Sequence, residues 1–474
     1  MSRKVYLPAD AGMIEYIGAV RGFTAELGQR KGESPLVFVQ TFGCQQNEAD
    51  SERLAGTAVA MGYLLTDDAQ RADLIVVNTC AVREHAEKRT LSIIGQYKHI
   101  KEKNPDLVIA VCGCMVGQEH RRDELKMRYP YVDITFPPGM IQVFPQMLAE
   151  RLAGGRRSFA LPQERPEIVE DIPVHRESSY RAWVSVMYGC NNFCTYCIVP
   201  YVRGRERSRR PEAIEKEVRE LLESGVRDIT LLGQNVNSYG KNSEFDCSFA
   251  ELLDRVSDLD GDFKLHFMTS HPKDATRELI DVIAKKDKVA KQLHLPLQSG
   301  SDRILSAMNR HYTLEQYMDK LDYFREKLPE ASVTSDIIVG FPGETEQDFE
   351  ATLEALRRAR YDRIFSFIYS PRKGTPAAEM PDQIPDAVKN ERFSRLVALQ
   401  NEISLKKNQA LLGKTLRVLC DGVSKNDPDM LEGRTEQDKI VIFKGDASMA
   451  GQFVELTVTR VETFNLYGEI KNQT

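Results

Sequence analysis

The chain has 474 residues, of which 42% are hydrophobic and 28% are charged. This length predicts several domains, and the composition excludes a disordered or fibrous chain. The 64 basic and 70 acidic residues give a net charge of −6, so any nucleic acid would have to bind a local basic surface. No apolar run reaches the roughly 18 residues of a membrane helix, and no secretory signal is visible, so we expect a cytoplasmic protein without membrane contact.

The first third of the chain predicts a parallel-sheet α/β domain. Residues 1–34 have no strong period, and we treat them as an N-terminal extension of unassigned role. Within residues 35–152, short apolar runs at 36–42, 74–78 and 107–111 alternate with helical patterns. This alternation is typical of parallel strands joined by crossover helices. A run rich in Pro, Gly and charged residues follows, and it predicts a linker over residues 153–176.

Residues 177–407 predict a partial barrel of six strand–helix units. The expected strands lie at 183–187, 228–232, 263–268, 292–295, 333–339 and 364–369. By analogy with complete barrels, chemistry belongs at the carboxyl ends of these strands. A helix over 386–412 leads into residues 408–474, where strand-like runs at 414–420, 439–444 and 452–460 predict a small antiparallel β-barrel. The expected fold class is therefore α/β with a terminal β-barrel.

Three cysteines, which we call the first cysteine set, each follow a predicted strand of the N-terminal domain. They are Cys44, Cys80 and Cys114. Because the carboxyl ends of parallel strands form one crevice, the three thiols can converge. Such a soft site suits an iron–sulfur cluster or zinc, whereas a buried free cysteine is the ordinary alternative for any single one of them. Cys112 lies within its strand, and we predict that it packs in the core.

The second cysteine set comprises Cys190, Cys194 and Cys197, which lie within eight residues just after the first strand of the barrel. Three local thiolates can hold a 4Fe-4S cluster and leave one iron open to a chelating ligand. A structural zinc site is the alternative, but it normally needs four protein ligands, and neither a second cysteine pair nor a nearby His supplies the fourth.

The second set resembles the Cys-x-x-x-Cys-x-x-Cys motif of the radical S-adenosylmethionine (SAM) enzymes. The resemblance extends over roughly residues 36–469, and among these enzymes the chain resembles the methylthiotransferases. It is carried by Phe42-Gly-Cys-Gln-Gln-Asn47, Ala49-Asp-Ser-Glu52, Asn78-Thr-Cys-Ala-Val-Arg-Glu84, Gly113-Cys-Met115 and Gly433-Arg-Thr435. Within the family, two motifs are most similar to those of the branch that acts on dimethylallyladenosine in tRNA. They are the first motif above and Leu231-Leu-Gly-Gln-Asn-Val-Asn-Ser-Tyr-Gly240. Gln46 departs from the pattern, which has Met there.

This resemblance implies an auxiliary-cluster domain, a radical SAM core and a terminal TRAM-like barrel that binds RNA. It implies two 4Fe-4S clusters, held by the two cysteine sets, and SAM as radical source and methyl donor. The implied reaction is methylthiolation of C2 of N(6)-dimethylallyladenosine at position 37, in the anticodon stem-loop of tRNA. The implied partners are an electron donor such as flavodoxin or ferredoxin and sulfur-delivery or cluster-assembly proteins, and we expect a monomer.

Several residues are candidates for contact with SAM, while the catalytic chemistry itself would be carried by the clusters. The resemblance assigns the methionine amino group to Gln234, which follows the second barrel strand. Tyr196 beside Cys197 could pack along the adenosine. The remaining candidates, for the ribose or carboxylate, are Gln298, Arg310 and Asp336. Capping and salt-bridge roles are the ordinary alternatives.

An arginine run follows the second cysteine set at Arg203, Arg205, Arg207, Arg209 and Arg210. A run of charged residues usually forms a solvated face. This one, however, lies directly after the second cysteine set, beside the expected active site, so we predict that it contacts tRNA phosphates. In the terminal barrel, the expected RNA contacts are Lys439, Phe443 and Lys444, through phosphates and base stacking.

Two alternatives remain open at this point. Within the family, the target could instead be threonylcarbamoyladenosine in tRNA or an aspartate of a ribosomal protein. In a different class, the chain could be a non-catalytic iron–sulfur protein that binds RNA.

Overall fold

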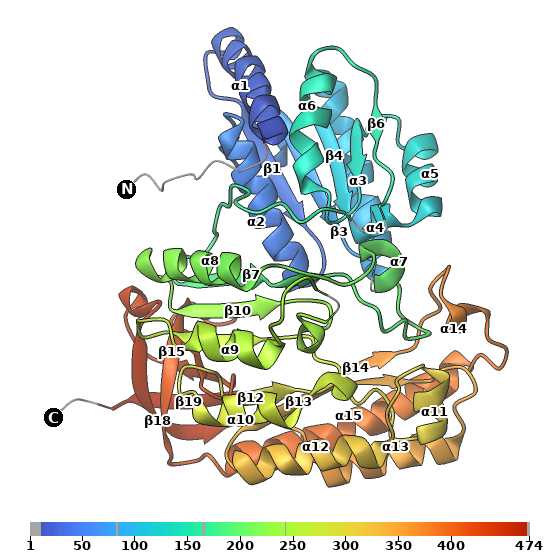
Figure 1. Cartoon of the computed structure of the whole chain (residues 1–474), viewed down its shortest axis with the longest axis vertical. Coiled ribbons are helices and arrows are strands. Elements are labelled where there is room, and N and C mark those ends of the chain that lie inside the picture. Colours follow the sequence, from blue (N-terminus) through green and yellow to red (C-terminus); the bar gives the residue numbers. More distant parts are fainter. Residues whose placement is uncertain (1–10, 82–83, 164–165, 242, 472–474) are drawn as a thin grey trace.

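The computed structural model describes residues 11–81, 84–163, 166–241 and 243–471 (Figure 1). Its N-terminal unit is a sheet of six parallel strands in the order β2-β1-β3-β4-β5-β6. These strands are β1 (Leu36–Thr41), β2 (Leu64–Leu65), β3 (Leu74–Thr79), β4 (Val108–Gly113), β5 (Ile134–Phe136) and β6 (Ser158–Phe159). Every residue of β3 and β4 is buried, as expected for central strands with helices on both faces. The three strands predicted here are confirmed, whereas the short β2, β5 and β6 were not foreseen.

The helices of this unit alternate with its strands. They are α2 (Gln45–Ala60), α3 (Glu84–Lys103), α4 (Cys114–Gly117), α5 (Glu119–Arg128) and α6 (Phe144–Leu152). The alternation confirms the crossover architecture expected from the sequence.

The N-terminal extension contributes a helix to the same unit. Helix α1 (Ala11–Lys31) lies beside α6 and buries Met13, Ile17 and Val20 against the sheet (Figure 1). The Thr24 hydroxyl also donates a 2.8 Å hydrogen bond to the carbonyl of Met61. This part of the extension therefore completes the N-terminal core, while residues 1–10 lie outside the described residues.

The central unit has the six parallel strands that the sequence predicts. They form two sheets, ordered β11-β10-β7 and β12-β13-β14, joined through a parallel bridge between Leu265 and Val289. The strands are β7 (Arg181–Ser185), β10 (Asp228–Leu232), β11 (Lys264–Phe267), β12 (Gln292–His294), β13 (Ser332–Val339) and β14 (Arg363–Ile368). Among the described pairings none joins β7 to β14, so the barrel is partial, as predicted.

Helices cover the outside of this partial barrel. The principal ones are α8 (Pro211–Glu223), α9 (Phe249–Ser257), α10 (Arg277–Lys285), α12 (Leu314–Lys327), α13 (Glu346–Ala359) and α15 (Asp386–Gln409). Side chains such as Ser248 and Thr345 cap their N-termini in capping boxes, which satisfy backbone N–H groups that the helix itself leaves free.

The C-terminal unit is a closed five-stranded barrel in the order β15-β16-β17-β19-β18. Its strands are β15 (Thr415–Val423), β16 (Leu431–Thr435), β17 (Ile440–Phe443), β18 (Phe453–Val461) and β19 (Asn465–Ile470). The expectation of a wholly antiparallel barrel needs one correction, because β17 and β19 pair in parallel.

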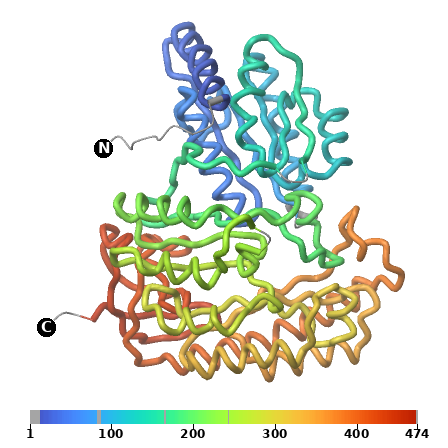
Figure 2. Tube along the Cα trace, viewed as in Figure 1, coloured from blue at the N-terminus to red at the C-terminus, as the bar shows by residue number. Residues whose placement is uncertain are grey.

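The C-terminal barrel docks at the amino ends of the central strands, as the chain trace shows (Figure 2). Arg181, the first residue of β7, forms a 2.5 Å ion pair with Asp421. The Ser332 hydroxyl, at the start of β13, donates to the Gln437 carbonyl at 2.7 Å. The barrel therefore lies at the opposite end of the central strands from the loops that carry the second cysteine set.

Candidate functional site

The first cysteine set gathers at the carboxyl edge of the N-terminal sheet. Thr79 and Gly113 are opposite each other in the β3–β4 register, so Cys80 and Cys114 follow neighbouring strand ends. Gly43 precedes Cys44 with a φ of 127°, and a Cβ there would lie 2.9 Å from the Cβ of Cys80. The bend before Cys44 therefore needs glycine, both for its backbone angle and for its closeness to Cys80.

The three thiols of the first cysteine set influence one another electrostatically. Burial raises the pKa of Cys114 to about 12, a nearby Arg203 opposes the rise, and Cys80 and Cys44 add to it. Without a metal, burial favours the neutral thiol of Cys114, whereas a bound metal would reverse this preference and hold its thiolate.

Asn47, in the first turn of α2, ties the loops of this set together. Its amide nitrogen donates to the carbonyls of Phe42 at 3.0 Å and Thr79 at 2.8 Å, which precede Cys44 and Cys80. Its side-chain oxygen faces the thiol of Cys44 at 3.7 Å. In the sequence, Asn47 stands out only as part of a motif, and the run of polar residues at the start of α2, which is buried, is the signal that points to it.

The second cysteine set lies in the loop between β8 (Met187–Tyr188) and β9 (Arg207–Ser208), which pair as an antiparallel hairpin. Burial raises the pKa of Cys190 to about 12, and it raises the pKa of Cys197, to which the charges of Cys194 and Cys190 add. The guanidinium of Arg310 donates to the sulfur of Cys194 at 3.2 Å. The three thiols are therefore close neighbours, and one of them, Cys194, accepts from a buried cationic donor.

The two cysteine sets meet where α4 contacts α7 (Val199–Arg203) (Figure 1). Ala81, Cys114, Ile198 and Val202 form a small buried cluster between them. Ala81 follows Cys80 and Ile198 follows Cys197, so the cluster joins the loops of both sets directly. This contact brings the two candidate metal centres to one junction between the N-terminal and central units.

Within the described residues, no group of three His, Cys, Asp or Glu side chains is arranged to hold a single metal ion. An iron–sulfur cluster spaces its cysteine ligands more widely than one ion does, because each thiolate binds a different iron.

The candidates for SAM contact lie around the second set, at the carboxyl end of the central strands. Gln234 accepts from the backbone N–H of Gly189 at 2.5 Å, beside Cys190. Gln298 is buried with a φ of 71°, and its side-chain oxygen has no hydrogen-bond partner in the described structure. Its backbone N–H donates to the carbonyl of Asp336 at 2.8 Å. These three residues thus share one end of the barrel.

Arg310 and Tyr196 form a pair beside Cys194. One terminal nitrogen of Arg310 lies 3.4 Å from the Tyr196 hydroxyl, and the other donates to the Pro296 carbonyl at 3.1 Å. Its Nε donates to the Tyr312 hydroxyl at 3.1 Å. Every nitrogen of the Arg310 guanidinium therefore has an acceptor within the protein.

The arginine run does not form one RNA-facing surface. Arg203 and Arg209 are 6% and 5% exposed, and both are held in buried ion pairs, so the prediction that they contact RNA is wrong. Arg207 is half-buried, donates to the carbonyl of Pro166, and has its pKa lowered by burial to about 10. Arg205 is half-buried over the ring of Phe193. Arg210 remains exposed.

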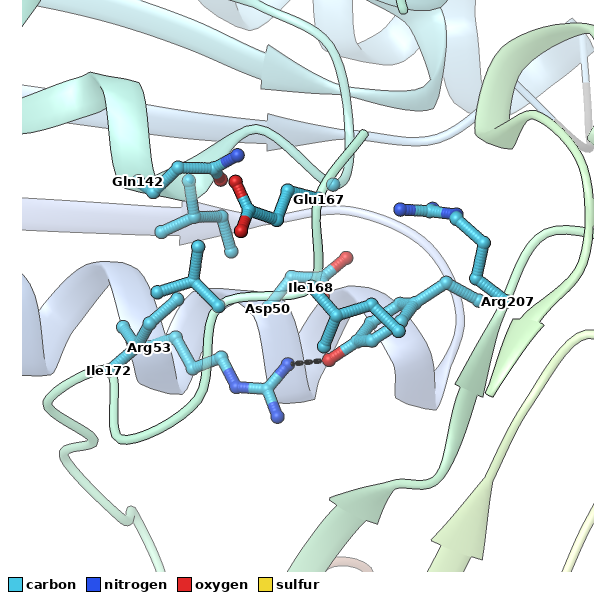
Figure 3. A pocket seen from close by; sticks show the side chains of 11 residues that line it. Asp50, Arg53, Gln142, Glu167, Ile168, Ile172 and Arg207 are labelled. Carbon is cyan, nitrogen blue, oxygen red and sulfur yellow. Dashed lines mark hydrogen bonds between the residues drawn. The ribbon is translucent and has the colours of Figure 1, made fainter. Parts of the chain in front are cut away.

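A small pocket lies where the N-terminal unit, the segment before residue 177 and the central unit meet (Figure 3). Arg53 from α2 donates to the Tyr188 hydroxyl across this junction, and Arg207 lines the same pocket. The guanidinium of Arg207 therefore belongs to the junction between units. Asp50, which pairs with Arg203, also lines this pocket.

The barrel residues expected to touch RNA differ in their surroundings. Phe443 is fully buried in the barrel core, so it cannot stack on a base. The Lys439 ammonium pairs with Asp362 at 2.8 Å and donates to Asn408 at 2.9 Å, which attaches the barrel to the central unit. The prediction for Phe443 is therefore corrected, whereas Lys439 is partly exposed and Lys444 is exposed, so contact of these two with RNA stays a prediction.

Gln46, the departure from the family pattern, bridges the two units. Its amide nitrogen donates to the Ser185 hydroxyl of β7 at 2.8 Å and to Asp50 at 3.2 Å. The amide of Gln234 faces its side-chain oxygen at 3.4 Å. This side chain therefore connects the loop of the first cysteine set to the central unit near the second.

Three family models match successive parts of the chain. The model of the "Uncharacterized protein family UPF0004" matches residues 36–137, the Radical SAM superfamily matches 184–356, and the TRAM domain matches 409–471. No described helix combines the length and apolar character that crossing a bilayer requires.

Curated relatives and solved structures are similar to the chain over most of its length. The tRNA-2-methylthio-N(6)-dimethylallyladenosine synthase of Thermoanaerobacter pseudethanolicus is 48% identical over 93% of this chain and 94% of its own. The synthase of the same name from Clostridium botulinum strain Alaska E43 is 50% identical over 92% of this chain and 96% of its own. The radical SAM methyltransferase TsrM from Kitasatospora setae has a TM-score of 0.55 at 15% identity, over 73% of this chain and 75% of its own, which shows the likeness of fold.

Proposed function

Because the chain belongs to the family of tRNA-2-methylthio-N(6)-dimethylallyladenosine synthases, we propose that it attaches a methylthio group to C2 of N(6)-dimethylallyladenosine at position 37 of tRNA. It is a radical SAM methylthiotransferase with a TRAM domain, and it acts on tRNA. The observation that carries this proposal is the junction of the two cysteine sets at the α4–α7 contact. A radical source and a sulfur store must serve the same carbon atom, and this junction places two thiol sites side by side.

Members of this family use SAM and 4Fe-4S clusters. We propose Cys190, Cys194 and Cys197 as ligands of the cluster that binds SAM, and the first cysteine set as ligands of the auxiliary cluster. When bound, the cluster on the second cysteine set and SAM would supply the radical that removes hydrogen from C2, and the auxiliary cluster on the first cysteine set would supply the sulfur. The residues present fit these groups, since each set offers three neighbouring thiols and one buried arginine N–H donor.

The protein's own contribution is to orient these groups and exclude water. Gln234, Gln298 and Asp336 are proposed SAM contacts at the end of the barrel, and Tyr196 is a proposed neighbour of its adenosine. The unpaired oxygen of Gln298 supports this assignment, because a buried polar atom without a partner is costly unless a ligand satisfies it. Arg310, each of whose guanidinium nitrogens already has an acceptor within the protein, is proposed to act by orienting Cys194.

For the tRNA, we propose that Arg205, Arg210 and Lys444 contact phosphates, because their side chains are at least partly exposed. The C-terminal barrel lies at the far end of the central strands from the second cysteine set, so an RNA bound to both must extend along the central unit. We further propose a cytoplasmic enzyme that draws electrons from a flavodoxin- or ferredoxin-like donor and sulfur from a delivery or cluster-assembly protein.

The test is an anaerobic assay of the reconstituted protein with SAM, a strong reductant and sulfide. Separate reactions contain tRNA with dimethylallyladenosine and tRNA with threonylcarbamoyladenosine, and nucleosides are identified by mass spectrometry. A methylthio product only on the first tRNA is expected. Product only on the second tRNA would show that the substrate is threonylcarbamoyladenosine. SAM cleavage with neither product would point to a target such as a ribosomal protein. Absence of 5′-deoxyadenosine in a cluster-loaded protein would favour a non-catalytic RNA-binding protein.

A triple variant tests the division of labour between the cysteine sets. Replacing Cys44, Cys80 and Cys114 by Ala should remove about half of the bound iron and abolish methylthiolation while SAM cleavage continues. Cys112→Ala is the matched control, because this buried cysteine also lies at the end of β4 and belongs to neither set. Loss of SAM cleavage in a folded triple variant would contradict the assignment.

A further inference from the structure

The side chain of Arg203 reaches from the central unit into the first cysteine set. Its Nε donates to the sulfur of Cys114 at 3.2 Å. A terminal nitrogen of the same guanidinium donates to Asn47 at 2.9 Å and to Asp50 at 3.0 Å. One residue of the central unit therefore binds a cysteine of the set and the two polar side chains of α2 behind it.

Arg203 and its carboxylate partner are both buried, so the guanidinium depends on partners within the protein. The side chains of Arg203 and Asp50 are only 5% and 7% exposed. A buried cation needs compensating partners, and the carboxylate of Asp50 provides the opposite charge. The rigid fork of an arginine can serve a second acceptor at the same time, and here the Nε–H is aimed at the cysteine sulfur.

The backbone around Arg203 is fixed by helix packing. Arg203 is the last residue of α7, and Val202 of this helix approaches α4 so closely that a Cβ on Gly117 would lie 2.8 Å from its Cβ. Val202 also packs against Cys114 in the small cluster between the sets. Since α7 begins two residues after Cys197, the position of Arg203 is tied to the second cysteine set.

We propose that Arg203 is a positioning residue for the auxiliary cluster, which it holds in place relative to the second cysteine set and whose negative charge it offsets. This inference rests on the proposed role of the first cysteine set as cluster ligands. Hydrogen bonds to ligand sulfur and nearby positive charge favour the reduced, more negative state of an iron–sulfur cluster. Arg203 therefore raises the reduction potential of the auxiliary cluster.

Arg310 provides the corresponding contact in the other set, because it donates to the sulfur of Cys194 at the same distance of 3.2 Å. The partners differ, however. Arg310 is held by Tyr312 and Pro296 of the central unit itself, whereas Arg203 crosses between units. Of these two arginines, Arg203 is the one that contacts a cysteine of one set while its backbone is fixed by packing next to the other set.

The experiment uses the full-length chain with Cys190, Cys194 and Cys197 replaced by Ala, so that the auxiliary cluster alone gives the signal. In this background, Arg203→Gln and Arg203→Lys are compared with the parent by redox titration followed by electron paramagnetic resonance. Arg203→Gln should shift the potential to a more negative value and change the spectrum of the reduced cluster. Arg203→Lys, which keeps the charge but loses the fork, should give a smaller shift. Arg219→Gln, an exposed change of equal charge on α8, should leave both unchanged.

An unchanged potential and spectrum in Arg203→Gln at full iron content would overturn the proposal and leave the residue a purely structural role. If Arg203→Gln does not fold, the potential and spectrum of Arg203→Lys are used instead. This variant keeps the charge and loses only the N–H aimed at the sulfur, so an unchanged potential and spectrum would again overturn the proposal. In the same background, the additional change of Cys44, Cys80 and Cys114 to Ala should abolish iron binding. Iron that persists there would refute the ligand assignment itself, which is separate from a failure of Arg203→Gln to shift the potential.

Discussion

Replacing Glu217 by Gln should weaken the junction between the central unit and the segment that leads into it. Glu217, on α8, accepts from Arg209 at 2.6 Å and from Arg176 at 2.8 Å. Its side chain is 20% exposed and that of Arg209 only 5%. The amide of Gln keeps the shape of the carboxylate but removes the negative charge that compensates both arginines.

The magnitude follows from the pKa of Glu217. Burial alone would raise it, but Arg209, Arg176 and Arg53 lower it from 4.5 to about 2. A difference of about 2.5 pKa units corresponds to roughly 3 kcal/mol of stability for the ionised group. Because the folded-state pKa is lowered, this contribution is complete above about pH 5 and is lost as the pH falls towards 2.

The assay is urea denaturation followed by the fluorescence of Trp183, the single Trp of the chain. Trp183 lies on β7, and its carbonyl accepts from Arg176 at 2.9 Å, so it reports on this junction. At pH 7, Glu217→Gln should lose about 3 kcal/mol, and the loss should shrink between pH 5 and pH 3. Glu223→Gln, an exposed change at the end of the same helix, is the matched control. A loss below about 1 kcal/mol at pH 7, or one that does not depend on pH, would refute this reasoning.

Three further predictions follow from the packing of single residues. Phe443→Ala should destabilise the C-terminal barrel by about 3–5 kcal/mol in thermal unfolding, whereas exposed Lys444→Gln should change it little, and the reverse order would place Phe443 at the surface. Gly117→Ala, whose Cβ would lie 2.8 Å from α7, should increase proteolysis between the two units, while Gly95→Ala, with open space around it, should not. Arg210→Gln should reduce the salt dependence of tRNA binding by a slope of about 0.7–0.9, and an unchanged slope would show that Arg210 makes no phosphate contact.

The six central strands were predictable because each is a short apolar run followed by a helical pattern. The strand at Asp228–Leu232 has the bounds that the sequence indicated, and the others differ by one or two residues at one or both ends. In the C-terminal barrel, β16 (Leu431–Thr435) and β19 (Asn465–Ile470) were not foreseen. Both contain Gly, Glu and other polar residues that are typical of turns, and only pairing with neighbouring strands makes them extended.

The first cysteine set could be predicted because its convergence depends on chain topology, whereas the second set is already close in sequence, within one loop. Cysteines placed just after neighbouring parallel strands must meet at one edge, whatever the surrounding side chains are. The arginine run carries no comparable signal. Its five arginines are alike in sequence, but the exposed fraction of their side chains differs widely. It is 5% for Arg203 and Arg209 and 71% for Arg210.

What separates Arg203 and Arg209 from Arg210 is the burial of the carboxylates that they meet, because Arg210 pairs with Glu244, whose side chain is 92% exposed. Asp50 from α2 reaches Arg203, and Glu170 from the segment before the central unit reaches Arg209. Such pairs join residues far apart in the chain, so no local pattern contains them. A basic run beside a catalytic loop is therefore ambiguous from sequence, because a nucleic acid and a neighbouring part of the same chain offer it the same negative charge. Burial decides between them: here Arg203 is held at the first cysteine set, and Arg209 is held at the contact between the central unit and the segment before it.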